Sequence, residues 1–474
     1  MTNLAEVLLA PAQATPNAIA LRAGTDAVTY RELESRAARV AGALQSEGVE
    51  PGARVTIEGR NTIAFVASYL GVLRVGAVAV PLNPHAPDPE LDREVATVEP
   101  AFALGPPIDG AGDADPSDNV SRDDSEVAVL LFTAGTAGAP KAAMLTHGNL
   151  TSNIRQVLDH PGLALNSGDV SLGVLPLFHV FGLNAVLGIG LAAGASTVLL
   201  EQFDAAGAVH AVRDHLVSVL AGVPAMYHAF LELDDDTAPP ESFESVRLAV
   251  SGAAPLDEDL LERMRKRFGV VVHDGYGLTE ASPIVTTSAI GRREPAAGSI
   301  GPPLPGIDVR LVDADGGDVL PGDPGEIRVR GPNVFPGYWR DTDATARALT
   351  SDGWLRTGDV AVADDEGELS LVDRAKDLII VSGFNVYPAE VEEALLEHPD
   401  VAEAAAVGEP DARTGEAIVA FVVPEPGSRP DPEVLLALCA RSLARYKCPA
   451  RVEIVDALPR SFAGKVLRRQ LRRD

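Results

Sequence analysis

One segment of the sequence has the composition of an anion-binding loop. Residues 130–141, LLFTAGTAGAPK, join an apolar, strand-like run to glycines, alanines and threonines that end at a lysine. Small residues let backbone N–H groups converge on an anion, the hydroxyls of Thr133 and Thr136 add donors, and Lys141 adds positive charge. The GxxxxGK[ST] pattern of the usual P-loop is absent. This segment alone therefore fits either a phosphate loop or a plain turn.

Four further segments combine charged or aromatic residues with tight turns. They are Tyr276-Gly-Leu-Thr-Glu280, Trp354-Leu-Arg-Thr-Gly-Asp359, Asp373-Arg-Ala-Lys-Asp377 and Leu458-Pro-Arg-Ser-Phe-Ala-Gly-Lys465. Taken singly, each has an ordinary structural explanation. Glu280 suits a helix N-terminus, where a carboxylate interacts favourably with the helix dipole. Asp359 suits a turn cap, and Lys465 belongs to a basic C-terminal tail.

A histidine lies among apolar residues at 176–182, PLFHVFG. His179 in such a setting fits a core histidine with a satisfied hydrogen bond as well as a residue that lines a pocket. The other eight of the nine histidines show no metal-ligand spacing, which argues against a zinc ion bound by the protein.

The elements that must position these residues follow an alternating pattern from residue 30 to about residue 290. Helical periodicity predicts helices at 30–47 and 63–74. Short apolar runs predict strands at 54–58, 77–82, 127–132, 197–200, 217–220, 246–250 and 270–273. Buried runs separated by helices indicate βαβ units and a mainly parallel sheet. Residues 105–126 and 234–242 are rich in Gly, Pro, Asp and Ser, which predicts surface loops.

The pattern changes after about residue 300. Short strand-like runs at 309–312 and 326–330 flank the turn sequence DADGGD, which predicts a small β-rich subdomain. From residue 378 onward the order is β-α-β again, and a helix is expected at 432–445. The last 100 or so residues therefore have the pattern of a separate small α+β domain. The predicted fold class is α/β.

Charge excludes two classes of partner. The 474 residues include 39 Lys and Arg against 68 Asp and Glu, a formal net charge of −29. Such an acidic field argues against nucleic acid and against an anionic membrane surface. Cys439 and Cys448 are too few for a disulfide scaffold, and we identify neither a secretory signal nor an integral membrane segment. A soluble cytoplasmic protein is expected.

The loop at 130–141 and the four further segments named above make five motifs. In their order along the chain, they resemble the motifs of the adenylate-forming superfamily, which contains acyl-CoA synthetases, luciferases and peptide-synthetase adenylation domains. The likeness extends from Tyr30 to Arg469. Four of the chain's five lysines lie in segments that match the family, namely Lys141, Lys376, Lys447 and Lys465. The fifth, Lys266, has the setting of a solvated helix residue.

The resemblance implies a site for ATP and Mg²⁺. Thr279 would contact the α-phosphate, Glu280 would help to hold Mg²⁺, and Lys465 would reach the α-phosphate and the substrate carboxylate. The β- and γ-phosphates would lie on the loop residues Thr133, Gly135, Thr136, Gly138 and Lys141. The adenosine would contact Gly252, Tyr276, Asp359 and Arg374. These residue types fit the chemistry, because a carboxylate that attacks a phosphate needs positive charge to offset repulsion.

The resemblance also implies two domains and two orientations between them. The domains would be 1–375, which binds ATP and the acyl substrate, and 376–474, a small mobile lid that pivots near Lys376. One orientation would insert Lys465 for adenylation, and the other would bring the loop at Gly383 to a tunnel for the thiol of CoA. His179 would lie beside the acyl site, with no acid–base role. From its residue type alone, Lys376 is equally a surface lysine.

The sequence departs from the family pattern in two motifs. The phosphate loop has Ala134, Ala137 and Ala142 where Ser, Thr and Gly are usual, and Ser461 and Phe462 replace the commoner residues before Lys465. Each missing hydroxyl weakens phosphate contacts by roughly 0.5–3 kcal/mol. The charged and metal-binding candidates are all present, so an active enzyme is favoured.

The predicted function is that of an AMP-forming acyl-CoA synthetase. It would convert an apolar monocarboxylic acid, aliphatic before aromatic, into acyl-AMP and then into acyl-CoA. None of the candidate acyl-pocket residues is basic, so a second substrate carboxylate would lack a partner. Two alternatives stay open: a fatty-acyl-AMP ligase or carrier-protein acylating enzyme, and a catalytically weak acyl-nucleotide binding protein. Whether the chain forms a homodimer is also open.

The substitution Lys465→Ala tests the implied catalytic lysine. Removing one such electrostatic contact lowers a rate by about 10²–10³. We therefore expect pyrophosphate release from ATP and acid to fall by that factor in Lys465→Ala. Unchanged adenylation would contradict the role.

Overall fold

The computed structural model describes most of the chain, and every statement below concerns the residues that it describes. These are residues 3–108, 110, 114–133, 140–254, 256, 258–290, 298–313, 315–365, 367–374, 379–459, 466 and 468–472. The domain boundary predicted at 375/376 lies outside them.

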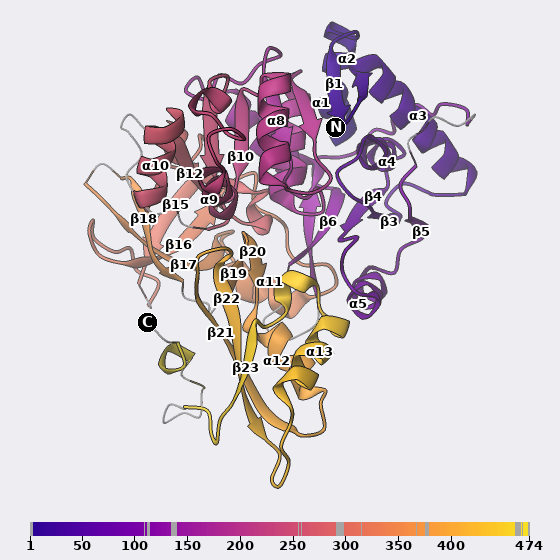
Figure 1. Cartoon of the computed structure of the whole chain (residues 1–474). Coiled ribbons are helices and arrows are strands. Elements are labelled where there is room, and N and C mark those ends of the chain that lie inside the picture. The colour runs from indigo at the N-terminus through magenta and orange to yellow at the C-terminus, as the bar shows by residue number, and fades with distance from the viewer. Residues whose placement is uncertain are drawn as a thin grey trace.

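Two mainly parallel β-sheets form the larger part of the molecule (Figure 1). The first sheet has eight strands, of which the six central ones are parallel while β2 and β13 are antiparallel edges. In sheet order, the strands are β13 (Ile284–Thr287), β12 (Val272–Gly277), β11 (Leu248–Ser251), β10 (Val219–Gly222), β8 (Val170–Gly173), β9 (Ser196–Leu199), β1 (Ile19–Ala23) and β2 (Asp26–Thr29). The predicted parallel sheet is confirmed.

The second sheet has five strands. In order, they are β5 (Phe102–Leu104), β3 (Arg54–Glu58), β4 (Val78–Leu82), β6 (Val127–Thr133) and β7 (Lys141–Thr146). All pairs are parallel except β6–β7, which is antiparallel and sets Thr133 opposite Lys141. This pairing holds the two ends of the predicted phosphate loop side by side.

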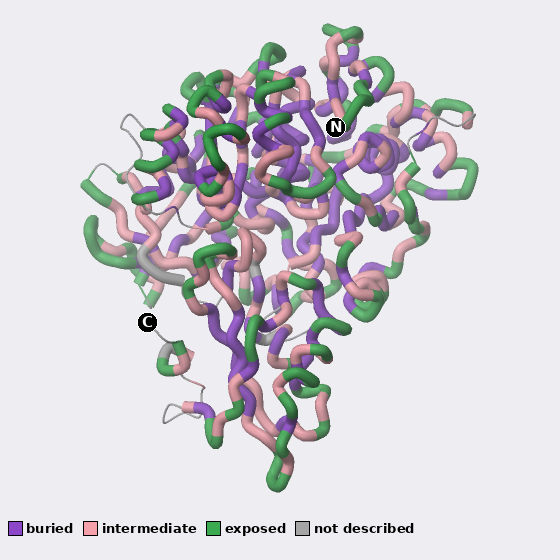
Figure 2. The backbone as a smooth tube through the Cα atoms, viewed as in Figure 1, coloured by how far each residue is buried: buried purple, intermediate pink, exposed green. Residues whose placement is uncertain are grey.

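Helices fill the space between the two sheets. Helix α3 (Tyr30–Ser46) begins at a capping box of Thr29 and Glu32 and buries an apolar face at helical spacing. Helix α4 (Ile63–Arg74) is apolar on nearly every side and contacts strands of both sheets. Figure 2 shows buried residues concentrated in this layer between the two sheets. The other segments of this layer are α1 (Leu4–Leu9), α6 (His147–Leu158), the π-helix η1 (Phe181–Gly188) and α7 (Ile189–Ala192).

A second core lies on the outer face of the first sheet. Helix α8 (Ala205–His215), α9 (Pro224–Glu232) and α10 (Glu258–Phe268) pack there with the 3₁₀ turn η2 (Pro240–Phe243). Their buried apolar residues share this core with residues of β8, β10 and β12. Two peripheral helices are α2 (Pro11–Ala14) and α5 (Asp88–Val98). Within the described residues, no helix combines the length and the apolar character needed to span a bilayer.

A third, antiparallel sheet forms the predicted β-rich subdomain. Its strands, in order, are β14 (Ser299–Gly301), β18 (Leu369–Arg374), β17 (Leu355–Ala363), β16 (Gly325–Arg330) and β15 (Asp308–Val312). Helix α11 (Thr342–Ala348) and the short turns η3 (Thr279–Ala281) and η4 (Ser288–Ile290) complete this region.

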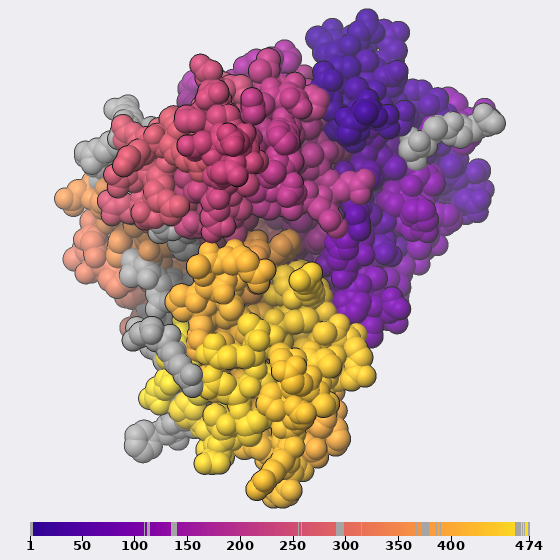
Figure 3. Space-filling model, viewed as in Figure 1, coloured from indigo at the N-terminus to yellow at the C-terminus, as the bar shows by residue number. Residues whose placement is uncertain are grey.

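The residues from 379 onward form the small α+β domain, which packs against the rest of the molecule as a distinct body (Figure 3). Its strands are β19 (Ile379–Val381), β20 (Phe384–Val386), β21 (Val401–Asp411), β22 (Gly415–Pro424) and β23 (Arg451–Ile454). Helices α12 (Pro388–Leu396) and α13 (Pro432–Ser442) cover one face of this sheet, and the 3₁₀ turns η5 (Arg445–Lys447) and η6 (Arg468–Gln470) follow α13.

Several predicted boundaries are wrong. The helix expected at 432–445 ends at Ser442, because the chain becomes extended at Leu443 and turns. The strand expected at 217–220 begins at Val219, and the loop expected at 234–242 ends in the turn η2. Strands β1, β2 and β8 lie outside the predicted elements.

Candidate active site

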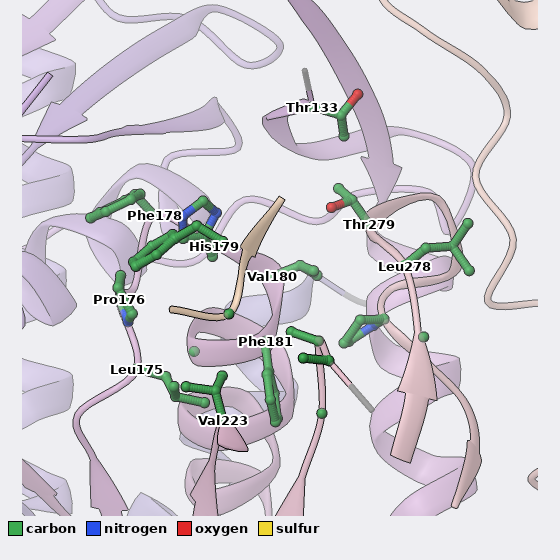
Figure 4. Close-up of a pocket in the computed structure, with 18 of the residues that line it drawn as sticks. Thr133, Leu175, Pro176, Phe178, His179, Val180, Phe181, Val223, Leu278 and Thr279 are labelled. Atoms are coloured by element: carbon green, nitrogen blue, oxygen red, sulfur yellow. The ribbon is translucent and has the colours of Figure 1, made fainter. Parts of the chain in front are cut away.

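A cavity of about 1210 Å³ lies at the carboxyl ends of β10, β11 and β12. Ligands of parallel α/β sheets bind at this edge, because loops leave the sheet there on a common side. The small domain contributes Ser382–Phe384 and Arg445–Lys447 to the cavity wall. Figure 4 shows the residues that line one part of it, including Thr133, His179, Phe181, Val223 and Thr279.

Tyr276 and Asp359 meet in this cavity although they belong to different sheets. Tyr276 is the last residue but one of β12, and its hydroxyl donates a hydrogen bond of 2.8 Å to Oδ2 of Asp359 on β17. The backbone of Asp359 is fixed by a hydrogen bond from its N–H to Oγ1 of Thr357. Strand pairing sets Arg374 directly opposite Asp359, although the structure describes only the backbone of Arg374. The arrangement provides an aromatic ring and a carboxylate next to each other.

Thr279 and Glu280 follow β12 in the turn η3, and both line the cavity. Oε1 of Glu280 accepts a hydrogen bond of 2.5 Å from the hydroxyl of Tyr338, and its backbone carbonyl accepts one from Phe335 N–H. Burial and the Glu280 carboxylate raise the pKa of Tyr338, so its hydroxyl remains a donor. Sequence reasoning missed Tyr338, because it lies in no motif.

Glu280 has the chemistry of a Mg²⁺ ligand. Mg²⁺ in nucleotide sites is held by one or two carboxylates together with the substrate's phosphates. Glu280 supplies one carboxylate that faces the cavity, and the Tyr338 hydroxyl orients it from one oxygen. The donor set therefore fits a metal that arrives with a nucleotide.

The ends of the predicted phosphate loop also open into the cavity. Thr133 and Lys141 line it, and the ammonium group of Lys141 lies 5.7 Å from the ring centre of Tyr338. The loop residues Gly135, Thr136 and Gly138 lie outside the described residues, as do the alanine substitutions Ala134 and Ala137. Lys376 and Lys465 also lie outside them.

A buried carboxylate that sequence reasoning missed lies in the same wall. Asp274 on β12 is 5% exposed and accepts a hydrogen bond of 2.9 Å from Gly275 N–H. Burial raises its pKa to about 7. Asp274 is two residues before Tyr276, so the GYG segment could have drawn attention to it. At neutral pH the side chain can therefore accept or donate a hydrogen bond.

Two glycines let other segments approach closely. A Cβ atom on Gly252 would lie 3.1 Å from the ring of Phe181. Gly383 has a φ of +82°, and a Cβ there would lie 2.5 Å from Cγ1 of Val223. Only glycine allows this conformation and this contact together. Gly383 thereby brings the small domain against the large one.

His179 lies where the two domains meet. Its ring centre is 4.6 Å from that of Phe178 and 5.2 Å from that of Phe384 in the small domain. In Figure 4 the ribbon of the small domain passes beside His179 and Val180. Burial, with a smaller effect of Lys447, lowers the pKa of His179 to about 4. The imidazole is therefore neutral at physiological pH, consistent with a wall residue.

Comparison with known families matches nearly the whole chain. The model for the AMP-binding enzyme family matches residues 8–339, and the model for the AMP-binding enzyme C-terminal domain matches residues 390–465. The chain is 40% identical over 487 residues to a feruloyl-CoA synthase of an Amycolatopsis species, covering 98% of this chain and 97% of the relative. It is 36% identical to a long-chain-fatty-acid–CoA ligase of Yersinia pestis, covering 94% and 90%.

A solved structure of a CoA synthetase has the same fold over nearly the whole chain. The o-succinylbenzoate CoA synthetase of Bacillus subtilis, bound to a product analogue, superposes with a TM-score of 0.91 at 31% identity. The superposition covers 98% of each chain. Both the sheets and the small domain therefore have counterparts in that enzyme.

The substitution Asp359→Asn tests the predicted contact between this carboxylate and the ribose hydroxyls of ATP. A hydrogen bond to a charged group contributes about 1.5–3 kcal/mol, which corresponds to about 10–100-fold in affinity. We expect the Kd for ATP, measured by calorimetry, to rise by that factor. Asp308→Asn, which changes an exposed carboxylate on β15, is the control. An unchanged Kd in Asp359→Asn would contradict the assignment.

Proposed function

The chain belongs to the AMP-binding enzyme family and is an AMP-forming acid–CoA ligase, and we propose that its acid is an apolar monocarboxylate, a fatty acid before an aromatic acid. The reaction has two halves. The carboxylate attacks the α-phosphorus of ATP and releases pyrophosphate, and the thiol of CoA then attacks the acyl-AMP and releases AMP. The observation that carries the proposal is the apolar part of the cavity.

This apolar part follows β10 and β11 away from the nucleotide residues. Lining residues occur at or just after the carboxyl ends of β10 and β11, Val223 and Ser251, and also at the amino ends of these strands, Val219 and Leu248. Three residues of strand span about 10 Å. The space therefore extends along the strands as a channel into the protein.

The channel walls are uncharged. They come from α6 and the segment after it, from η1 and α7, and from β10 and β11: Val157, Leu163, Leu165, Ala185, Ile189, Val219, Ala221, Leu248 and Val250. Among these described residues there is no cation that would pair with a second carboxylate. A dicarboxylate or an amino acid would therefore bury an unpaired charge, which is strongly unfavourable.

The polar end of the cavity supports the first half-reaction. We propose that Glu280 and Mg²⁺ offset the charge of the phosphates, that Thr279 contacts the α-phosphate, and that Lys465 stabilises the charge that develops there. Tyr276 and Asp359 would hold the adenosine, with Arg374 beside them. Thr133 and Lys141, together with Gly135, Thr136 and Gly138, would hold the departing pyrophosphate.

A phenylpropenoic acid is the second candidate substrate. The feruloyl-CoA synthase is 40% identical to this chain, against 36% for the long-chain-fatty-acid ligase. An aromatic acid is also an apolar monocarboxylate, and its ring would lie beside Phe181 and Val223. It would leave the end of the channel at Leu163 and Leu165 unfilled.

A panel of carboxylic acids tests this proposal. We expect pyrophosphate release to be fastest with fatty acids, slower with phenylpropenoic acids, and slowest with malonate and amino acids. With CoA, the same acids should yield a thioester and AMP. Fastest release with malonate or an amino acid would contradict the apolar substrate. Pyrophosphate without any CoA thioester would favour a carrier-protein acceptor, and no pyrophosphate would favour a binding protein.

The substitution Ala185→Phe tests whether the acyl chain lies in the channel. Ala185 is half-buried and faces the cavity, so a phenyl group there would fill the channel. Each excluded methylene costs about 1–3 kcal/mol in binding. We expect kcat/KM to fall at least tenfold for long fatty acids and to change little for butanoate. The control is Ala206→Phe on α8, which lies outside the cavity. An equal loss of kcat/KM for short and long acids would show that the acyl chain of the substrate does not lie in this channel.

A further inference from the structure

A buried ionic contact joins the two domains, and its side chains also line the cavity. Glu90 on helix α5 of the large domain uses both carboxylate oxygens. Oε1 lies 2.5 Å from Nζ of Lys447, and Oε2 accepts a hydrogen bond of 2.7 Å from Ala444 N–H. Both partners belong to the small domain and follow α13 directly. Nearby, Arg93 donates a hydrogen bond of 3.2 Å to the carbonyl of Ser442.

Water is largely excluded from this contact. The side chains of Glu90 and Lys447 are only 8% and 10% exposed, and Lys447 also lies 3.3 Å from the buried Glu390 of α12. Burial, and then the charge of Glu90, raise the pKa of Glu94 to about 8, so Glu94 adds little negative charge at pH 7. In low dielectric an ion pair with satisfied hydrogen bonds is held firmly, whereas a member left without its partner is destabilising.

A short chain of contacts connects this ion pair to the acyl site. Lys447 follows Tyr446, whose ring stacks on Phe384 with centres 4.4 Å apart and planes at 22°. Phe384 in turn lies 5.2 Å from His179, and the adjacent Gly383 packs on Val223. The residues that meet Glu90 and the loop that enters the acyl site therefore belong to one packed unit.

Val466 and Arg468, which follow the candidate catalytic lysine in the sequence, contact other parts of the small domain. Val466, the residue after Lys465, packs with Ala405, Val407, Val419 and Phe421 of β21 and β22. Arg468 forms an ion pair with Glu392 of α12. None of the described residues between 456 and 472 lines the cavity. If Lys465 acts in adenylation, the small domain has to turn and the contacts of Glu90 have to break.

We propose that Glu90 is a positioning residue for thioester formation, because it anchors the small domain in the orientation that holds Gly383 and Phe384 at the acyl site. Glu90 does not touch the reacting atoms in this role. It acts through Ala444 and Lys447 on the wall through which CoA would reach the acyl-AMP. The inference rests on the proposed CoA-dependent half-reaction and on the proposed role of Lys465 in the other half.

The substitutions Glu90→Ala and Glu90→Gln test the anchor when the two half-reactions are measured separately. Pyrophosphate release reports adenylation. Conversion of the preformed acyl adenylate of the preferred acid, at saturating CoA, reports thioester formation. In Glu90→Ala we expect thioester formation to slow at least tenfold and adenylation to change less than twofold. Glu90→Gln retains an acceptor for Ala444 N–H, so its loss should be intermediate.

The control is Glu99→Gln, which changes an exposed carboxylate at the end of the same helix and should alter neither rate. Circular dichroism and the Tm of each variant show whether it folds. Equal losses in both half-reactions, or no loss in either, would overturn the anchor. The wild-type protein distinguishes a failure of the proposed function from a failure of the anchor. If the wild type forms acyl-AMP but no acyl-CoA, the proposed function fails before the variants are compared.

Discussion

Parallel pairing of β10, β11 and β12 is the constraint on which the site depends. Strands that run in one direction end at one edge, so the segments that follow them must leave the sheet on the same side. These segments carry Val223, Gly252, and the Leu278–Glu280 turn to a common cavity. The proposed acyl channel then extends back along the same strands. One topological feature thus places the proposed nucleotide residues at the mouth and apolar side chains along the interior.

The positive charge that a phosphate needs has to be placed locally, because the protein as a whole has a formal net charge of −29. Net charge argues against nucleic acid as a partner, but it does not govern a cavity in which donors and a metal are placed individually. Two tyrosine hydroxyls fix the two key carboxylates: Tyr276 donates to Asp359, and Tyr338 donates to Glu280. Each pair joins segments more than fifty residues apart, so the β-rich subdomain and the large sheet hold the site jointly.

The small domain is part of the site in the orientation observed. Gly383 and Phe384 enter the cavity against Val223 and His179, while Glu90 holds the adjoining residues Ala444 and Lys447 of the same domain. Each of these contacts would be lost if the small domain turned away from the large one. Its orientation is therefore set by the packing of Gly383 and Phe384 together with the adjoining buried charge pair, and both have to be released for a different orientation.

The sequence by itself determined the α/β class, the β-rich subdomain, the small domain and five motifs, since periodicity and motif chemistry are local properties. It also led to the nine predicted residues that the structure gathers around the cavity: Thr133, Lys141, His179, Gly252, Tyr276, Thr279, Glu280, Asp359 and Gly383. Helix ends and short strands were less predictable, because Leu443 and strands such as β8 follow tertiary contacts rather than propensity. Only the tertiary structure identified Glu90, Asp274 and Tyr338. Each is a polar residue of ordinary type outside any motif, and its importance arises from burial beside a partner that is distant along the chain.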